Sequence, residues 1–404
     1  MPRACRGGTG VGAGILFLPL NAGAFGFWPL VFATVFIFPL VYFSHRTYAR
    51  IVSGAPPEQH GKDVLELVRY YLGRNSGLFI AVLYWLAIVP TVLIYGISIT
   101  NVVDSFIVNQ LGGPEISRYI LAPLCVGLMT LALAFGNAIM LKIAQFVVYP
   151  LIVALAAVSL YLIPQWDLGS FMEAGDHTAG GVIKAIILIL PVLVFSFSFV
   201  AAISQFSLGM EKEYGADHHA QSDKVIRNSA ILLTVFTMFF VWSCALAMGA
   251  DGMQEANDKN LPVLSYFANE TGTPFMAYMA PIVVICAVAS SYFGHALGTI
   301  EGTQYLFNLA APKATKKMSA RTLDLWTYLF IFIATSLVGI FNPSILDMIS
   351  VVGGVFFAFM TYLLPIWVIY RVEALARFRS NKTNYFVAIM GLIVLFATIW
   401  GMFQ

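Results

Sequence analysis

The sequence predicts an all-α, polytopic membrane protein, and two properties of its 404 residues support this fold class. Apolar residues make up 59% even before the 33 glycines are counted, whereas a soluble domain reaches roughly 45–50% with glycine included. Only 10% of the residues are charged, against about 25% in soluble proteins. The charge is therefore confined to short loops between long apolar stretches, which excludes a water-soluble globule.

Eleven stretches are long and apolar enough to be spanning helices, which need roughly 20 mostly apolar residues. The predicted spans cover residues 9–24, 27–45, 77–105, 118–136, 142–163, 181–208, 227–250, 275–309, 325–341, 344–370 and 384–403. Between the second and third spans, residues 63–73 combine helical periodicity with charge. We expect a short surface helix there.

The distribution of lysine and arginine predicts the orientation, because cytoplasmic loops carry an excess of them. With the amino terminus inside, the outer loops hold only Arg118, Lys184 and Lys259 of the 22 basic residues. We therefore expect a cytoplasmic amino terminus and a carboxyl terminus outside the cell, in the inner or plasma membrane. Residues 1–8 do not form a signal peptide, because no apolar core precedes a cleavage site.

Charge and cysteine usage exclude several classes of partner. A net charge of +2 with scattered basic residues does not suit a nucleic-acid partner. The four cysteines, Cys5, Cys125, Cys244 and Cys286, have no CxxC spacing. They are typical of small core residues rather than of disulfides or metal ligands.

The first span contains three closely spaced glycines, Gly10, Gly12 and Gly14, followed by Pro19. Each glycine weakens a helix by roughly 1 kcal/mol relative to alanine. Broken backbone at membrane depth persists where it lines a cavity, and the helix that begins beyond the break directs free N–H groups into it. A carboxylate is a natural ligand for such a site. Close helix packing through small residues is the other interpretation of this spacing.

Several segments, taken in order, resemble the hydroxy and aromatic amino acid permeases, and especially their serine and threonine branch, within the amino acid/polyamine/organocation superfamily. The similar segments are residues 12–23, 25–30, 93–101, 160–166, 194–199, 261–269, 293–302 and 342–349. The resemblance implies a single transport domain over residues 1–404 with the leucine-transporter type of 5+5 inverted repeat. Repeat one would cover about 9–163, repeat two about 181–370, and one extra helix 384–403.

The resemblance also implies the substrate site. Gly12, Ala13 and Gly14 would offer backbone N–H groups to the substrate carboxylate. The sixth span would break around Ser196, Phe197 and Ser198, where carbonyl groups suit an ammonium. The alternative for the two serines is ordinary hydrogen bonding to carbonyls of their own helix.

A polar stripe in the third span adds candidate site residues. Tyr95, Ser98 and Asn101 recur on one helix face, where they either bond to neighbouring helices or face the transport path, with Tyr95 closing over the substrate.

The eighth span suggests how transport is coupled to a cation. Proton-coupled relatives carry a lysine where this chain has Ser290, so the fixed charge is absent. Ala287, Ser290 and Ser291 share one face and offer a carbonyl and two hydroxyls, which are oxygen ligands suited to sodium. His295, one turn further along, is the candidate for proton coupling, or else a neutral histidine packed on a helix carbonyl.

The sequence therefore predicts a secondary transporter that imports a small amino acid of the serine or threonine type by symport with sodium or a proton. No catalysis and no cofactor are expected, apart from sodium as the candidate coupling ion. An aromatic amino acid permease is the first alternative, because Phe199 and Val200 replace polar residues of the serine and threonine branch. A membrane-embedded enzyme is disfavoured because the six histidines are dispersed, whereas a transporter-derived sensor or inactive protein stays open.

The amino terminus predicts a truncated first helix. Residues 1–8, with Arg3 and Arg6, stand where relatives carry roughly a dozen further apolar residues. Arginine at the centre of a spanning helix costs at least about 2.5 kcal/mol. Either the start codon lies upstream, or the first span is a half-helix.

Overall fold

The computed structural model describes residues 13–133, 137–270, 273–315 and 318–403, and these residues form helices without a strand. Eight of the described helices are long and apolar enough to cross a membrane. Three shorter apolar helices occupy 14–24, 118–133 and 149–165. Together they fall in all eleven predicted ranges, so the prediction of an all-α polytopic membrane protein is confirmed.

The helices follow one another with short connections. Those of the first half are α1 (Ala13–Ala24), α2 (Phe27–Ser53), η2 (Pro57–Gln59), α3 (Val64–Ser105), η3 (Phe106–Gln110), α4 (Arg118–Leu133), α5 (Asn137–Leu162), η4 (Ile163–Gln165) and α6 (Leu168–Glu173). Those of the second half are α7 (Ala179–Phe197), α8 (Val200–Tyr214), η5 (Gly215–Asp217), α9 (His218–Asp258), α10 (Val263–Glu270), α11 (Pro274–Ala310), α12 (Pro312–Thr315), α13 (Ala320–Phe341), α14 (Ile345–Val351), η6 (Val352–Phe357), η7 (Phe359–Leu363), α15 (Leu364–Arg371), η8 (Glu373–Phe378) and α16 (Thr383–Gly401).

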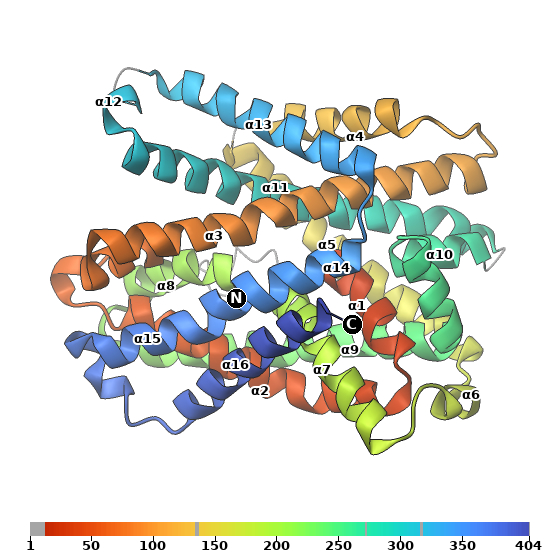
Figure 1. Ribbon diagram of the computed structural model, residues 1–404, viewed down its shortest axis with the longest axis horizontal. Coiled ribbons are helices and arrows are strands. Elements are labelled where there is room, and N and C mark those ends of the chain that lie inside the picture. The colour runs from red at the N-terminus through yellow and green to blue at the C-terminus, as the bar shows by residue number, and fades with distance from the viewer. Residues whose placement is uncertain (1–12, 134–136, 271–272, 316–317, 404) are drawn as a thin grey trace.

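The long helices pack in two groups. In Figure 1, α3, α4, α11 and α13 lie along one side of the molecule, and these four helices contact one another. On the other side α2 packs against α7, α9, α15 and α16. Helix α1 is held chiefly by α9 and α7, and it also contacts α11. The short first helix thus bridges the two groups from within the core.

Two glycines mark where the membrane-crossing part of a helix meets a surface part. Gly73 has φ 83° within α3, and Gly249 has φ 72° within α9. Glycine adopts positive φ at little cost because it lacks a Cβ atom. The segment before Gly73 starts at Asp63, which accepts the backbone N–H of Glu66 while the Glu66 side chain accepts that of Asp63. This reciprocal capping confirms that a helix begins in the predicted segment; its place at the membrane surface stays a prediction.

The tenth span departs from regular α-helix in a way that the sequence did not predict. Its middle, Val352–Phe357 and Phe359–Leu363, is π-helical. A Cβ atom on Gly353 would lie 2.8 Å from the Cβ of Phe195 and would also collide with the carbonyl oxygen of Pro191. The glycine therefore lets the π-helical segment lie directly against α7. Such widened turns are frequent at functional sites.

Candidate functional site

The sixth span is broken, as the resemblance implied. Helix α7 ends at Phe197 and α8 begins at Val200. Between them Ser198 is extended, with φ −78° and ψ 121°, and Phe199 has φ −119° and ψ 26°. A helix that stops here leaves its last carbonyls without intrahelical partners, and the next helix leaves its first N–H groups likewise. The break lies at Ser198 and Phe199, at the end of the predicted segment.

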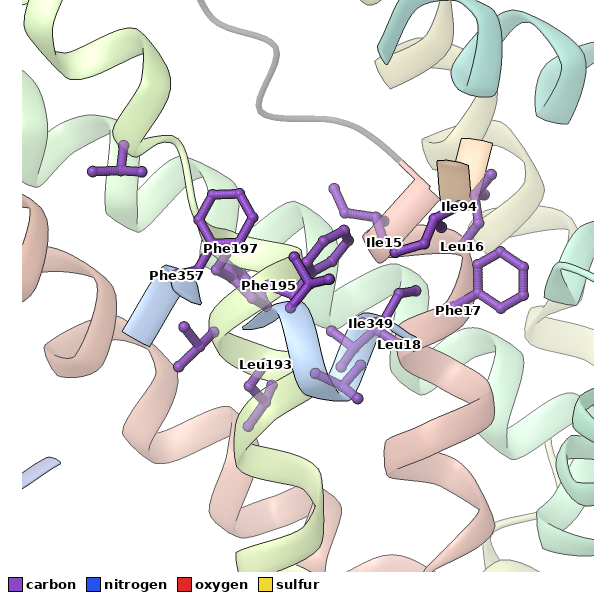
Figure 2. Packing of buried hydrophobic residues seen from close by; sticks show 14 of the residues in the cluster. Ile15, Leu16, Phe17, Leu18, Ile94, Leu193, Phe195, Phe197, Ile349 and Phe357 are labelled. Atoms are coloured by element: carbon purple, nitrogen blue, oxygen red, sulfur yellow. The ribbon is translucent and has the colours of Figure 1, made fainter. Parts of the chain in front are cut away.

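The start of α1 lies against this break. The hydroxyl of Ser196 donates to the carbonyl oxygen of Gly14 over 2.9 Å, and the side chain of Ser196 is only 7% exposed. A Cβ atom on Gly14 would lie 2.8 Å from the Cα of Ser196, which is closer than two such atoms tolerate. Figure 2 shows buried apolar side chains at this junction, among them Ile15, Phe195 and Phe357. The first and sixth spans are therefore closely packed at Gly14.

The predicted carboxylate ligands are only partly described. Gly12 lies outside the described residues, whereas Ala13 and Gly14 form the first positions of α1. The described part of this helix begins at Ala13, directly after the residues outside the description. The carboxylate role of these backbone N–H groups therefore stays a prediction.

The structure brings Tyr95 together with two residues of the predicted cation group. The side chains of Tyr95 and Ser291 are hydrogen-bonded, and the rings of Tyr95 and His295 meet edge to face with centroids 5.3 Å apart. Helices α3 and α11 are packed along much of their length, which explains the meeting. The predicted substrate residue and the predicted coupling residues therefore share one interface.

Ser290 and His295 each bond to the backbone of α11. The Ser290 hydroxyl donates to the Ala287 carbonyl oxygen at 3.0 Å, and His295 Nδ1 lies 3.0 Å from the Ser291 carbonyl oxygen. A hydroxyl that donates its proton keeps its oxygen lone pairs. The Ser290 oxygen therefore remains chemically suited to a cation.

Sequence reasoning missed a histidine at the break. His45 of α2 is 2% exposed, its Nε2 accepts the backbone N–H of Phe199 at 3.1 Å, and its Nδ1 lies 2.8 Å from the carbonyl oxygen of Val41. The imidazole also stacks on the Phe199 ring with centroids 4.0 Å apart. A lone histidine in an apolar helix gives no sequence signal for a partner 154 positions away.

Asn101, in the same polar stripe as Tyr95, bonds to segments beyond its own helix. The side-chain amide of Asn101 donates to the carbonyl oxygen of Asn260 at 2.8 Å and to the side-chain oxygen of Asn342 at 3.0 Å. Asn260 and Asn342 both have positive φ, 53° and 51°, a conformation that asparagine tolerates better than most residues. This asparagine cluster joins α3 to the segments that follow α9 and α13.

Cysteines and acidic residues offer no metal site in the part of the chain that is described. Cys125 and Cys244 are buried, Cys286 is half-buried, and all three are free thiols. No group of three or more histidine, cysteine, aspartate or glutamate side chains gathers among the described residues. The cysteines behave there as the small core residues that the sequence predicts.

Comparison with known proteins assigns the family. The family model described as "Transmembrane amino acid transporter protein" matches residues 8–404. The serine transporter SdaC of Escherichia coli (strain K12) is 36% identical over 403 residues, which cover 98% of this chain and 93% of that transporter. The threonine/serine transporter TdcC of Escherichia fergusonii is 35% identical over 420 residues, covering 98% and 94%.

The chain matches these transporters over nearly their whole length. The alternative of a membrane-embedded enzyme is therefore dropped. The broken sixth helix, the glycine contact at the start of α1 and the long apolar helices are the features of a polytopic carrier rather than of a catalytic centre. The chain therefore belongs to the family of transmembrane amino acid transporters.

Proposed function

We propose that this transporter imports a small hydroxy amino acid, serine or threonine, into the cell. The observation that carries the proposal is the contact between Ser196 and Gly14, which joins the broken sixth span to the glycine segment of the first span. A helix end at such a break suits the ammonium group of the substrate. The relatives that match the chain along its length are serine and threonine/serine transporters.

Competition for uptake tests this substrate class. The purified protein in proteoliposomes should take up labelled serine, and unlabelled serine and threonine should compete for uptake better than tryptophan. Stronger competition by tryptophan or tyrosine would favour the aromatic alternative. Absence of uptake for every amino acid tried, from protein that is folded and inserted, would favour a sensor or inactive protein.

The proposed coupling ion is sodium, held by the Ala287 carbonyl and the hydroxyls of Ser290 and Ser291. Three oxygen atoms on one helix face suit a hard cation, and Ser291 is hydrogen-bonded to Tyr95, so a cation there would act directly on the proposed substrate residue. Alanine at both Ser290 and Ser291 should weaken the sodium dependence of uptake. Sodium-independent uptake driven by a pH gradient would instead indicate protons, with His295 the first residue to substitute.

The proposed transport mechanism uses two halves of opposite orientation, residues 9–163 and 181–370. In such repeats the first helix of each half is interrupted at the substrate site, and rocking of one helix group against the other exposes the site to each side in turn. Support comes from the contact of α1 with the α7 break and from the two packed groups of helices. We place the protein in the inner or plasma membrane, with its amino terminus in the cytoplasm.

A further inference from the structure

The hydrogen bonds of His45 fix its protonation state in this structure. A backbone N–H can only donate and a carbonyl oxygen can only accept. Nε2 faces the N–H of Phe199 at 3.1 Å and Nδ1 faces the carbonyl oxygen of Val41 at 2.8 Å. The imidazole must therefore carry its single proton on Nδ1 and keep a lone pair on Nε2. In this arrangement His45 is neutral.

The acceptor that His45 supplies satisfies a backbone group at the break. Phe199 precedes the first residue of α8, and no side chain of that segment caps this end of the helix in the described part of the chain. Nε2 is thus the acceptor for a donor that the broken helix leaves without one. The stacked Phe199 ring, with its centroid 4.0 Å from that of the imidazole, fixes the orientation of the imidazole.

Charged groups near α2 are engaged with partners other than His45. Arg46 donates to Thr383 at 2.7 Å and lies 3.7 Å from Asp223 of α9, and Arg50 stacks on Phe378. Glu211 of α8 accepts from Gly61.

The polar side chain that bonds next to Nδ1 of His45 carries no charge. It is Ser44, whose hydroxyl oxygen lies 3.2 Å from Nδ1, and Tyr362 of η7 donates to the Leu40 carbonyl oxygen one turn earlier in α2. None of these contacts supplies an anion that would hold a proton on Nε2.

We propose that His45 is a positioning residue of the substrate site, which holds the break between α7 and α8 only while its imidazole is neutral. Protonation of Nε2 would turn the acceptor into a donor facing the N–H of Phe199, and the two donors would separate. The break adjoins Ser196, which bonds to Gly14, so the change would reach the proposed substrate groups. This inference rests on the proposed function.

Two substitutions at His45 test the hydrogen-bond acceptor Nε2 and the stacked ring one at a time. His45→Gln places an amide oxygen as many bonds from the backbone as Nε2, and that oxygen accepts at every pH. His45→Phe keeps the stacked ring and removes both nitrogens. His177→Gln is the matched control, because the exposed His177 bonds to the nearby Glu173 carbonyl oxygen and precedes α7, at the opposite end of that helix from the break.

The first readout is equilibrium exchange of labelled serine across vesicles without ion gradients, measured between about pH 8 and pH 5, where histidine changes its charge. The wild-type protein and His177→Gln should lose exchange as the pH falls. His45→Gln should keep it, and His45→Phe should be slower by roughly tenfold or more at every pH. An unchanged acid loss in His45→Gln, or normal exchange by His45→Phe, would overturn the proposal.

The second readout does not depend on transport. Hydrogen exchange of the backbone amides in residues 195–203, compared at one pH, should be faster in His45→Phe than in the wild-type protein and close to wild type in His45→Gln. Equal exchange in all three would refute the role of His45. A wild-type protein that moves no serine but shows this difference would refute the proposed substrate while supporting the role of His45.

Discussion

At the scale of single residues, the contact between Gly14 and Ser196 leaves no room for a methyl group. A Cβ atom on Gly14 would lie 2.8 Å from the Cα of Ser196, so Gly14→Ala should push α1 and α7 apart at a cost of about 1–3 kcal/mol. We expect uptake to be lost while the protein still inserts into the membrane. Gly180→Ala is the control, because no atom lies within 4 Å of a Cβ at Gly180. Normal uptake by Gly14→Ala would rule out the proposed site.

Ser196 gives a second prediction at this scale. Its hydroxyl donates to the carbonyl oxygen of Gly14 on another helix at 2.9 Å, whereas the buried Ser159 donates to Leu155 of its own helix at 2.8 Å. Ser196→Ala and Ser159→Ala should each lower the stability to unfolding by about 1 kcal/mol. Only Ser196→Ala should also raise the substrate concentration needed for half-maximal uptake. An equal effect of both substitutions on uptake would reduce Ser196 to a structural role.

Features that lie within one short segment could be predicted from the sequence, whereas contacts between distant helices could not. The break near Ser198 was predicted through a resemblance in a short segment. By contrast, His45, which was missed, bonds to Phe199, 154 positions away. Asn101 was named, but its partners, 159 and 241 positions away, were not. Such contacts depend on how helices pack, which helical periodicity in one segment does not specify.

At the scale of helices, the approach of the tenth span to the sixth depends on Gly353. A Cβ atom there would lie 2.8 Å from that of Phe195 and would collide with the Pro191 carbonyl oxygen. Gly353→Ala should therefore destabilise the protein by about 1–3 kcal/mol, measured as a lower thermal transition, and should slow uptake. Gly127→Ala in α4 is the control, since its Cβ would meet Phe332 at an ordinary 3.4 Å. An unchanged thermal transition for Gly353→Ala would contradict this account.

Hydropathy predicted where the helices lie better than it predicted their irregular turns. The apolar stretch at 384–403 corresponds to α16, Thr383–Gly401, because burial in lipid requires length and apolarity alone. The stretch at 344–370 gave no sign of its π-helical middle, since that geometry arises from contact with α7. The positive φ of Gly249 was likewise indistinguishable from an ordinary glycine in the sequence.

At the scale of the whole molecule, the two helix groups give the short α1 a particular place. It contacts α7 and α9 of one group and α11 of the other. Substitutions that separate α1 from α7 should therefore change how the two helix groups pack against each other. They should also displace the residues proposed to bind the substrate. This is the geometry in which the substrate can be bound at the surface between two bodies that rock against each other.

The orientation of the molecule yields the last prediction. The eleven predicted spans would place the two ends of the chain on opposite sides of the membrane, and the basic residues Arg50 and Arg377 both stack on Phe378, where α2 meets η8. Since cytoplasmic loops collect lysine and arginine, this end should face the cytoplasm and the end of α16 should lie outside. A reporter that is active only outside the cytoplasm, fused after residue 404, should be active, and the same reporter fused after Arg379 should be silent. The reverse pattern would invert the orientation and turn the proposed import pathway around.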